Sequence, residues 1–288
     1  MSEMDDLIKA FSDISILFIG YDGYVDVWNH CFELLNKNWP NRPKTYLACS
    51  ELKPNYDNVE IINAGKNSEW SKKVQVALDQ IDTKYVLLML EDFFVSEPVD
   101  NKKIINALEL VRSDDIKFYQ ILVQLIHQDR IKGQPYKGDR HIHVVPKDKK
   151  YPLNLQAAIW DREFLKERVG TKNYNAWMFE INQLDVNMTR GPKIEFLIDD
   201  RNICNITHTV VQSKYLPGAI KQLKNKGYNI DRTERNVLSP KDNFKYLLKL
   251  YMYEITPQWL VKPAKQIGKL MKVDFVTDRI AKGSSEKK

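Results

Sequence analysis

The stretch YVLLMLEDFF, residues 85–94, runs from six mostly apolar residues straight into two adjacent acids, Glu91 and Asp92. A short apolar run of this kind predicts a buried strand. Acids at the end of a buried strand need a reason, because carboxylates are rarely buried without a partner. In open α/β sheets, ligands bind where the carboxyl ends of the strands meet the loops. The fold of the surrounding chain therefore decides what the two acids can do.

The chain around this strand alternates between strand and helix patterns. Strand patterns cover 14–20, 44–50, 58–65, 118–126, 140–146 and 193–198, and helical spacing covers 24–39, 68–81, 101–113 and 175–188. Residues 155–169 change from a strand pattern to a helical one. The alternation predicts an α/β domain around a mostly parallel central sheet flanked by helices. We expect this domain to span 1–239, a helical tail to span 240–282, and 283–288 to be disordered.

The composition is that of an ordinary globular protein. Of 288 residues, 43% are hydrophobic and 28% charged, and the net charge of +6 is too small to suggest nucleic acid as a partner. The acidic start is unlike a signal peptide, and no run approaches the ~20 apolar residues that a membrane span needs. Three cysteines without a CxxC pair fit reduced thiols. These features predict a cytoplasmic protein.

Paired carboxylates at a strand end can hold a divalent cation. Mg²⁺ and Mn²⁺ prefer oxygen ligands and commonly share them with a substrate diphosphate. The alternative is an acidic junction that caps a helix or faces water. The spacing alone does not separate the two.

Four stretches resemble bacterial GT-A-fold glycosyltransferases of surface-polysaccharide clusters. They are 68–94, which holds the opening strand, and the stretches FIGYDGYVDVWNHCFELLNKNWP (18–40), LNLQAAIWDREFLKE (153–167) and NAWMFEI (175–181). The resemblance covers roughly 14–235. It implies a GT-A-like (Rossmann-like) fold and an inverting transfer of sugar from a nucleotide-sugar, with UDP as leaving group, to a glycan or lipid-linked glycan. The implied setting is capsule, O-antigen or wall-glycan synthesis.

The same resemblance assigns roles to the acids of the opening strand. Glu91 and Asp92 correspond to a DxD-like motif, with Asp92 on the metal or diphosphate side and Glu91 nearer the ribose. His208 is a third candidate ligand for the expected Mn²⁺ or Mg²⁺. This chain departs from the family in having Glu91 where an aspartate is expected, and the longer side chain can shift or weaken metal binding.

Residues for the nucleotide come from the segment GYDGY (20–24). Asp22 can accept hydrogen bonds from a uracil or ribose, and Tyr21 or Tyr24 can stack on the base. Without the resemblance this segment is simply a turn rich in Asp and Gly. Lys214 lies in a stretch similar to a late family loop near the phosphates. The alternative for Lys214 is a solvated lysine.

Residues for the acceptor come from 153–181. Glu180 is the candidate base for the acceptor hydroxyl, because partial burial near Trp177 would raise its pKa. Trp177 and Trp160 are candidates for contact with the acceptor sugar. The alternative for Glu180 is an acid favoured by the start of a helix, and Trp177 can also be a core residue. His141 and His143 share one strand face, but no third metal ligand is spaced near them, so a solvated face is expected.

Two other functions fit part of the pattern. A nucleotidyltransferase on a similar sheet usually has a glycine-rich loop with Lys or Arg after the first strand, which GYDGYVDVW (20–28) lacks. A non-catalytic sugar-binding protein on a transferase scaffold is the other alternative, and the presence of Asp92 and Glu180 argues against it.

The tail pattern predicts an amphipathic basic helix. Five apolar residues fall on one helical face, and lysines lie off that face: Phe244, Leu247, Leu248, Tyr251 and Ile255, with Lys245 and Lys249. A second basic segment follows with Lys262, Lys265, Lys269 and Lys272. Such a helix can lie on an anionic membrane surface, which predicts a peripheral position at the inner face of the cell membrane. The alternative is packing on the domain or on a second subunit, giving a homo-oligomer.

Overall fold

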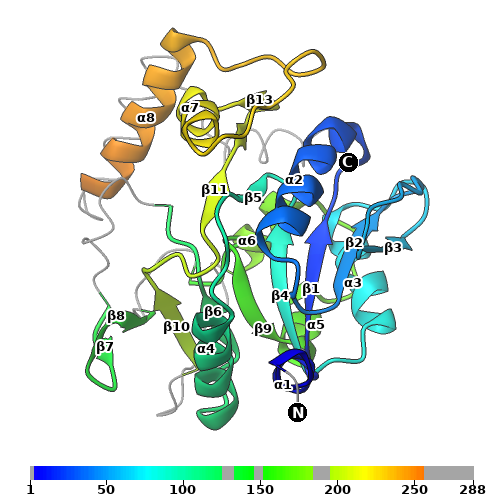
Figure 1. The fold of residues 1–288 in the computed structure, drawn as a ribbon, viewed down its shortest axis with the longest axis vertical. Helices are drawn as coiled ribbons and strands as arrows, with labels where there is room; N and C mark the ends of the chain where they lie inside the picture. The colour runs from blue at the N-terminus through cyan, green and yellow to red at the C-terminus, as the bar shows by residue number, and fades with distance from the viewer. Residues whose placement is uncertain (1–2, 125–132, 146–151, 184–194, 256–288) are drawn as a thin grey trace. The chain divides into compact units, whose positions relative to one another are not determined.

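The apolar runs of the sequence form one nine-stranded sheet in the computed structural model (Figure 1), with strand order β3-β2-β1-β4-β9-β6-β10-β8-β7. The structure describes residues 3–124, 133–145, 152–183 and 195–255. The strands of this sheet are β1 (Ile14–Ile19), β2 (Thr45–Cys49), β3 (Glu60–Asn63), β4 (Tyr85–Leu90), β6 (Phe118–Gln120), β7 (Pro135–Tyr136), β8 (Asp139–Val144), β9 (Ala158–Asp161) and β10 (Phe196–Asp199).

Most of these strands run in the same direction. β1 is parallel to β2 and β4, β2 to β3, and β6 to β10. β9 is antiparallel to both β4 and β6, so these two neighbours of β9 point the same way. β8 is the other reversed strand. The carboxyl ends of β1, β2, β3, β4, β6 and β10 therefore meet at one edge of the sheet, called the carboxyl edge below.

Helices cover both faces of the sheet. They are α1 (Glu3–Ala10), α2 (Val25–Asn38), α3 (Trp70–Gln80), α4 (Asn101–Ser113), α5 (Arg162–Val169), α6 (Ala176–Asn182) and α7 (Pro217–Asn225), with a 3-10 turn η1 (Asp22–Tyr24). α2 and α4 pack on one face in one hydrophobic cluster, and α3 and α5 pack on the other face in a second cluster. The predicted α/β class with a helix-flanked sheet is confirmed.

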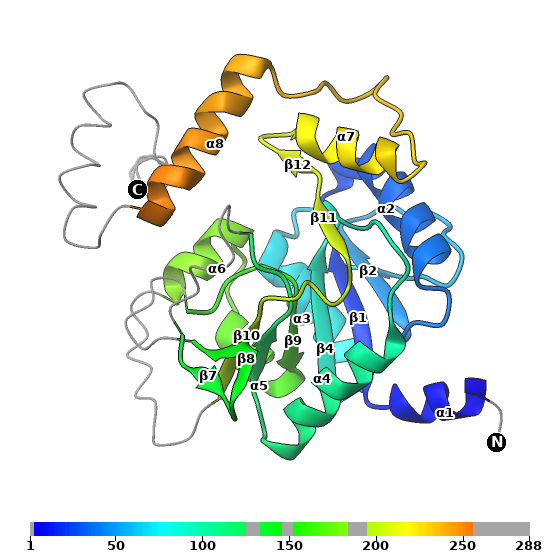
Figure 2. The same cartoon turned by 60° about the vertical axis from the view of Figure 1, so that its left-hand side comes forward.

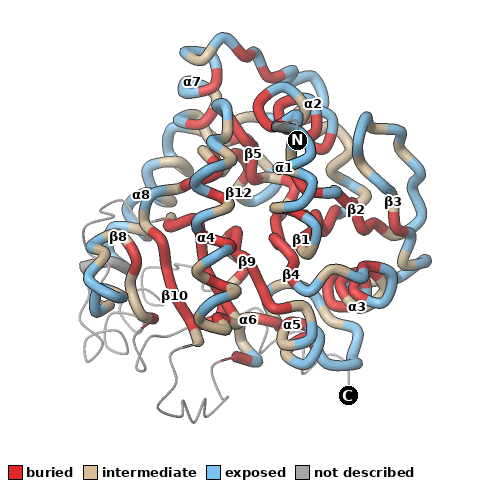
Figure 3. Tube along the Cα trace, turned by 60° about the horizontal axis from the view of Figure 1, so that its bottom comes forward, coloured by how far each residue is buried: buried red, intermediate tan, exposed pale blue. Residues whose placement is uncertain are grey.

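Alternating side chains of each strand supply the two cores. Leu87 and Met89 of β4 belong to the cluster under α2 and α4, whereas Val86 and Leu88 belong to the cluster under α3 and α5. Burial on both faces explains why these strands read as continuous apolar runs. Figure 3 shows β1, β4, β9 and β10 as largely buried segments, whereas the helices alternate between buried and exposed positions.

Two small sheets bring late segments to the end of β4. β5 (Phe93–Val95) pairs antiparallel with β11 (Ile206–His208), and β12 (Val210–Val211) forms a hairpin with β13 (Lys214–Tyr215). Figure 1 and Figure 2 both show β11 beside the upper end of β4. The sequence patterns did not predict these four short strands, nor α1 and α7.

The chain divides into two units, Met1–Ser239 and Pro240–Lys288. In the second unit the structure describes α8 (Pro240–Ile255), a helix of 16 residues. The predicted remainder of the tail, 256–282, and the predicted disordered end, 283–288, lie outside the described residues. Within the described part of the chain, no helix combines the length and apolarity that a bilayer span requires.

Candidate active site at the carboxyl edge

The strand order reverses between β1 and β4, and the residues after these two strands are in contact. From β1 the chain proceeds to β2 and β3 on one side, whereas β4 lies on the other side of β1. A reversal of this kind opens a crevice at the carboxyl edge, where α/β proteins bind their ligands. Here the Tyr21 amide, two residues after β1, donates a hydrogen bond of 3.0 Å to Glu91 Oε1, directly after β4. The predicted nucleotide segment and the predicted acidic motif therefore meet.

Glu91 is a buried carboxyl at this junction, with 7% of the residue exposed. Burial, and next the charge of Asp92, raise the pKa of Glu91 to about 8. The hydrogen bond from Tyr21 opposes this shift only in part. At neutral pH the protonated form of Glu91 therefore prevails, and the side chain acts mainly as a link between the two loops.

Asp92 faces a different set of partners. Its Oδ2 lies 3.0 Å from Nε2 of His208, the last residue of β11. Its backbone carbonyl accepts hydrogen bonds of 2.9 Å from both the amide and the hydroxyl of Thr209. Its Oδ1 is buried and has no hydrogen-bond partner among the described residues. An unsatisfied buried carboxylate oxygen is costly and calls for a ligand.

The predicted metal ligands are only partly assembled. Asp92 and His208 are in contact, whereas Glu91 Oε1 is engaged by Tyr21. Over the described residues, no group of three His, Cys, Asp or Glu side chains is arranged to hold a metal ion. Mg²⁺ commonly takes one or two protein carboxylates and completes its shell with phosphate and water. Asp92 fits such a site through its unsatisfied Oδ1, and His208 is held beside it by the contact with Oδ2. The metal requirement stays a prediction.

Asp22 ties two loops together. Its carboxylate accepts backbone hydrogen bonds of 2.8 Å from Ser50 and 3.1 Å from Glu51, in the loop after β2. Burial raises the pKa of Asp22, but these hydrogen bonds outweigh that effect and hold it below its usual value. The side chain thus has a structural role, and its predicted contact with the nucleotide stays a prediction.

Lys73 is a site residue that the sequence patterns missed. It is 4% exposed on α3, and its ammonium donates a hydrogen bond of 2.7 Å to the Gly20 carbonyl and lies 3.8 Å from Asp22 Oδ1. A buried ammonium needs such partners. Lys73 lies three residues after Trp70 and four before Ala77, and both of these residues are buried. This helical spacing could have predicted that Lys73 lies on the buried face of α3.

The two tyrosines after β1 differ in their surroundings. Tyr21 is 62% exposed, and its ring lies 5.4 Å edge-on from that of Tyr24. The guanidinium of Arg235 lies over the Tyr24 ring at 4.1 Å, and the Tyr24 hydroxyl and Ser213 Oγ share a hydrogen bond. Tyr21 is therefore the more accessible ring for stacking on a base. Arg235, which the sequence patterns also missed, holds Tyr24 in place.

Lys214 follows Ser213 in the β12–β13 hairpin. Because Ser213 contacts Tyr24, the hairpin brings Lys214 to the β1 side of the crevice. Lys214 is half-buried, and its ammonium has no hydrogen bond within the described ranges. A contact of Lys214 with phosphate stays a prediction.

Glu180 lies on α6 at the same edge of the sheet. α3 begins at the carboxyl edge, and its first residue, Trp70, packs at 5.0 Å on Phe179 of α6. Glu180 Oε1 accepts a hydrogen bond of 3.0 Å from the Leu155 amide. Burial raises the pKa of Glu180, and the bond from Leu155 lowers it only in part. A carboxylate with a raised pKa is suited to accept a proton near neutral pH.

The two tryptophans proposed for the acceptor have opposite environments. Trp177 is 58% exposed, one helical turn before Glu180, so both side chains lie on one face of α6. Trp160 is 0% exposed on β9 and packs at 4.5 Å on Phe118 in the core. The prediction that Trp160 contacts an acceptor is wrong, because its side chain is fully buried. The apolar strand pattern around Trp160 was the available signal of a core position.

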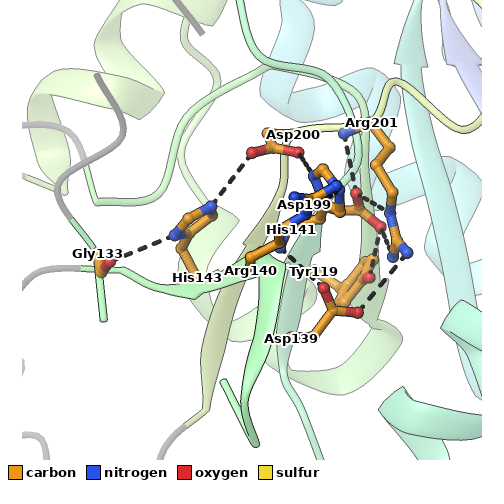
Figure 4. Close-up of polar contacts among 9 residues, drawn as sticks. All are labelled: Tyr119, Gly133, Asp139, Arg140, His141, His143, Asp199, Asp200 and Arg201. Carbon is orange, nitrogen blue, oxygen red and sulfur yellow. Dashed lines mark hydrogen bonds and ion pairs between the residues drawn. The ribbon is translucent and has the colours of Figure 1, made fainter. Parts of the chain in front are cut away.

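A second acidic pair ends β10, also at the carboxyl edge (Figure 4). Asp199 is fully buried and accepts hydrogen bonds from Tyr119 Oη at 2.8 Å and from Arg201 at 2.8 and 2.6 Å. Asp200 lies between two histidines, 2.9 Å from His141 Nδ1 and 3.2 Å from His143 Nε2.

The contacts of Asp200 correct one expectation. His141 and His143 were expected on a solvated face, but both contact this carboxylate, and the side chain of His143 is only 12% exposed. The residues IDD (198–200) repeat the pattern of an apolar strand that ends in paired acids, which was the available signal.

A hollow of about 380 Å³ lies away from Glu91 and Asp92. Its lining includes Lys66 and Asn67 after β3, Lys72 of α3 and Asn173. It opens two strands away from β1, so it is not the place where the acids gather. We assign it no role.

Comparison with known proteins finds distant structural neighbours. No family model and no curated protein sequence matches the chain. S. aureus TarS 1-349 in complex with UDP-GlcNAc matches with 13% sequence identity and a TM-score of 0.48. The match covers 91% of this chain and 76% of the TarS chain. An active-site mutant of LgtC matches with 11% identity, 85% and 98% coverage and a TM-score of 0.31.

A nucleotidyltransferase is also among the matched structures. A cytidylyltransferase from Leptospira borgpetersenii matches with 10% identity, 92% and 98% coverage and a TM-score of 0.37. The chain spans 58%, 47% and 43% of the length of three further matches, TarS 1-349, IspDF from Campylobacter jejuni and TarS. Likenesses this distant assign no activity to this chain, so a function has to be argued from the side chains.

Proposed function

We propose that this chain transfers a sugar from a nucleotide-sugar, with UDP as leaving group, to a glycan or lipid-linked glycan acceptor. The observation that carries the proposal is the hydrogen bond from Tyr21 to Glu91 where the strand order reverses. It gathers an exposed aromatic ring and two acids in the crevice where α/β sheets bind nucleotides. The resemblance of 18–40, 68–94, 153–167 and 175–181 to surface-polysaccharide glycosyltransferases supports the same reaction and a role in capsule, O-antigen or wall-glycan synthesis.

The proposed reaction is a single displacement with inversion. The oxygen of an acceptor hydroxyl bonds to the anomeric carbon of the donor sugar while the bond from that carbon to the diphosphate oxygen breaks. Glu180 accepts the hydroxyl proton, and the products are a glycoside and UDP. The raised pKa of Glu180 favours proton transfer to it, and Trp177 offers the acceptor a stacking surface on the same helix face.

The other site residues hold the donor side in shape. Lys73 and Asp22 fix the loop after β1 against the loop after β2. Tyr21 presents its ring to the base. Asp92 and His208 are the residues that would hold Mn²⁺ or Mg²⁺, and such an ion neutralises charge on a departing diphosphate.

A donor screen tests this function. The purified full chain is incubated with UDP-glucose, UDP-galactose and UDP-GlcNAc, with and without Mn²⁺, and UDP release is measured. We expect release with one donor, faster with an oligosaccharide acceptor, and slower by about 10²-fold or more in Asp92→Ala. Release of pyrophosphate from UTP and a sugar 1-phosphate would instead identify a nucleotidyltransferase. Binding of a UDP-sugar without turnover in any condition would identify a sugar-binding protein.

A further inference from the structure

One face of α8 exposes large apolar side chains together with lysines. Five apolar residues of α8 are 41–66% exposed: Phe244, Leu247, Leu248, Tyr251 and Met252. The described chain has ten large hydrophobic residues that are exposed in this way, so this one helix holds half of them. At 100° per residue the five fall within one side of the helix. Gathered exposure of this kind marks an interaction surface, whereas scattered single residues do not.

Lysines run along the edge of this apolar stripe. Lys241, Lys245 and Lys249 are exposed and spaced four residues apart, so they form a row, in which Lys245 and Lys249 lie beside the stripe. The stripe and the row together make a surface that is apolar along its centre and cationic along its border. A partner for this surface has to offer apolar material and negative charge at the same time.

The charge of the whole chain resides in the same unit. Residues 240–288 hold 11 lysines and arginines against five acidic residues, a net +6 that equals the formal net charge of the whole chain. Residues 1–239 are therefore neutral overall. Because the net positive charge lies in residues 240–288, an anionic surface attracts the second unit and exerts little net attraction on the first.

We propose that α8 binds the surface of an anionic lipid bilayer. Acyl chains at the headgroup boundary take up the apolar stripe, and lipid phosphates take up the lysine row. A nucleic acid would match the lysines but leave the apolar stripe in water. A second copy would match the stripe but bring two lysine rows of the same sign together. The proposal does not depend on the enzymatic activity proposed above.

Vesicle flotation with the full chain tests this binding. Vesicles of phosphatidylcholine alone are compared with vesicles that also contain phosphatidylglycerol, at low and high salt. We expect flotation with phosphatidylglycerol only, reversed by salt. Lys245→Gln/Lys249→Gln should lower the partition coefficient roughly 20-fold, since each lysine near an anionic surface is worth about fivefold. Phe244→Ser/Leu248→Ser should lower it at least as much.

Matched substitutions elsewhere separate the surface from general effects. Lys102→Gln/Lys103→Gln removes two exposed lysines from α4, and Met4→Ser/Ile8→Ser removes two exposed apolar residues from α1. Both controls should float like the unaltered chain. Equal binding to both vesicle types, or equal losses in the controls, would overturn the proposal. So would a dimer, seen by analytical ultracentrifugation, that Phe244→Ser/Leu248→Ser dissociates in a chain that never floats.

Discussion

Two adjacent carboxyl groups, Glu91 and Asp92, have opposite roles although the chain places them side by side. Glu91 is buried under the loop after β1, and its pKa rises to about 8, so it links loops in its neutral form. Asp92 pairs with His208 and keeps one buried oxygen unsatisfied. The sequence predicted that this pair is important, because acids after an apolar run are unusual. It could not predict the division of roles, since that depends on segments 70 and 116 residues away.

Asp92→Ala should lower kcat for sugar transfer by about 10²-fold or more, as the loss of one main electrostatic stabiliser does. The reason is that Asp92 is the less buried acid of the pair, contacts His208 and keeps one oxygen unsatisfied. Steady-state UDP release measures the effect. Asp82→Ala, at an exposed position before β4, is the control and should leave kcat unchanged. Turnover of Asp92→Ala at the unaltered rate would exclude this role.

Glu180→Gln should slow transfer severely while leaving UDP binding intact, because glutamine keeps the hydrogen bond from Leu155 but cannot accept a proton. We expect a loss of 10²- to 10⁴-fold in kcat, roughly the contribution of a positioned base. Calorimetry with UDP measures binding separately. Loss of UDP binding together with transfer would show that Glu180 has a different task.

The same variant should change how stability depends on pH. Because burial raises the pKa of Glu180, the folded chain keeps this proton at pH values where the unfolded chain has lost it. The stability from this group is thus complete below the unfolded value near 4.5 and declines as pH rises above it. Glu180→Gln removes the decline, so its Tm relative to the unaltered chain should be higher at pH 8 than at pH 4. An equal difference at both pH values would contradict the shift.

At the scale of elements, periodicity located the long strands and most helices, but it missed α1 and α7 and did not give the direction of the strands. The eight strand and strand-to-helix patterns of the sequence all correspond to elements of the structure. Strands buried on both faces are continuous apolar runs, whereas helices buried on one face have apolar residues every three or four positions. The direction of β9 has no such signature, since AAIW (157–160) is apolar in either direction. β5 and β11 have three residues each and exist only as partners of one another, so no local pattern predicts them.

Lys73→Met should destabilise the chain by roughly 1–3 kcal/mol, because it leaves the Gly20 carbonyl buried without a donor. It should also weaken UDP binding, since the loop after β1 loses its support from α3. Urea unfolding and calorimetry measure the two effects. Lys72→Met changes the exposed neighbour on the same helix and should do neither. A stable Lys73→Met with unaltered UDP affinity would show that this buried contact is dispensable.

At the scale of the whole molecule, a residue near the end of the first unit, Arg235, contacts residues near its start. Arg235 is 9% exposed and binds both carboxylate oxygens of Asp26 at 2.7 Å, at the start of α2. It also donates to the Ser213 and Gly23 carbonyls. One guanidinium therefore joins the β12–β13 hairpin, η1 and α2. The sequence near Arg235 does not predict these partners, because all of them lie at least 22 residues away.

Arg235→Ala should cost about 3 kcal/mol of stability, since it leaves the largely buried Asp26 without its counter-ion. Denaturant unfolding measures this cost. The KM for the donor should rise as well, because Tyr24 loses the cation over its ring. Arg232→Ala, at an exposed position three residues earlier, is the matched control. Equal stability of the two variants would show that Asp26 finds another partner.

The reversed strand β9 has a consequence for redesign of the protein. Because β9 runs against its neighbours, residues 152–157 enter the sheet at the carboxyl edge, and the register of Ala158 with Leu88 and Gln120 fixes where they enter. Leu155 in this segment holds Glu180. Residues 152–157 and α6 thus form a unit that is attached to the sheet through β9 and that can be exchanged as a whole. We expect that grafting a different unit there alters which acceptor is used while leaving donor affinity unchanged.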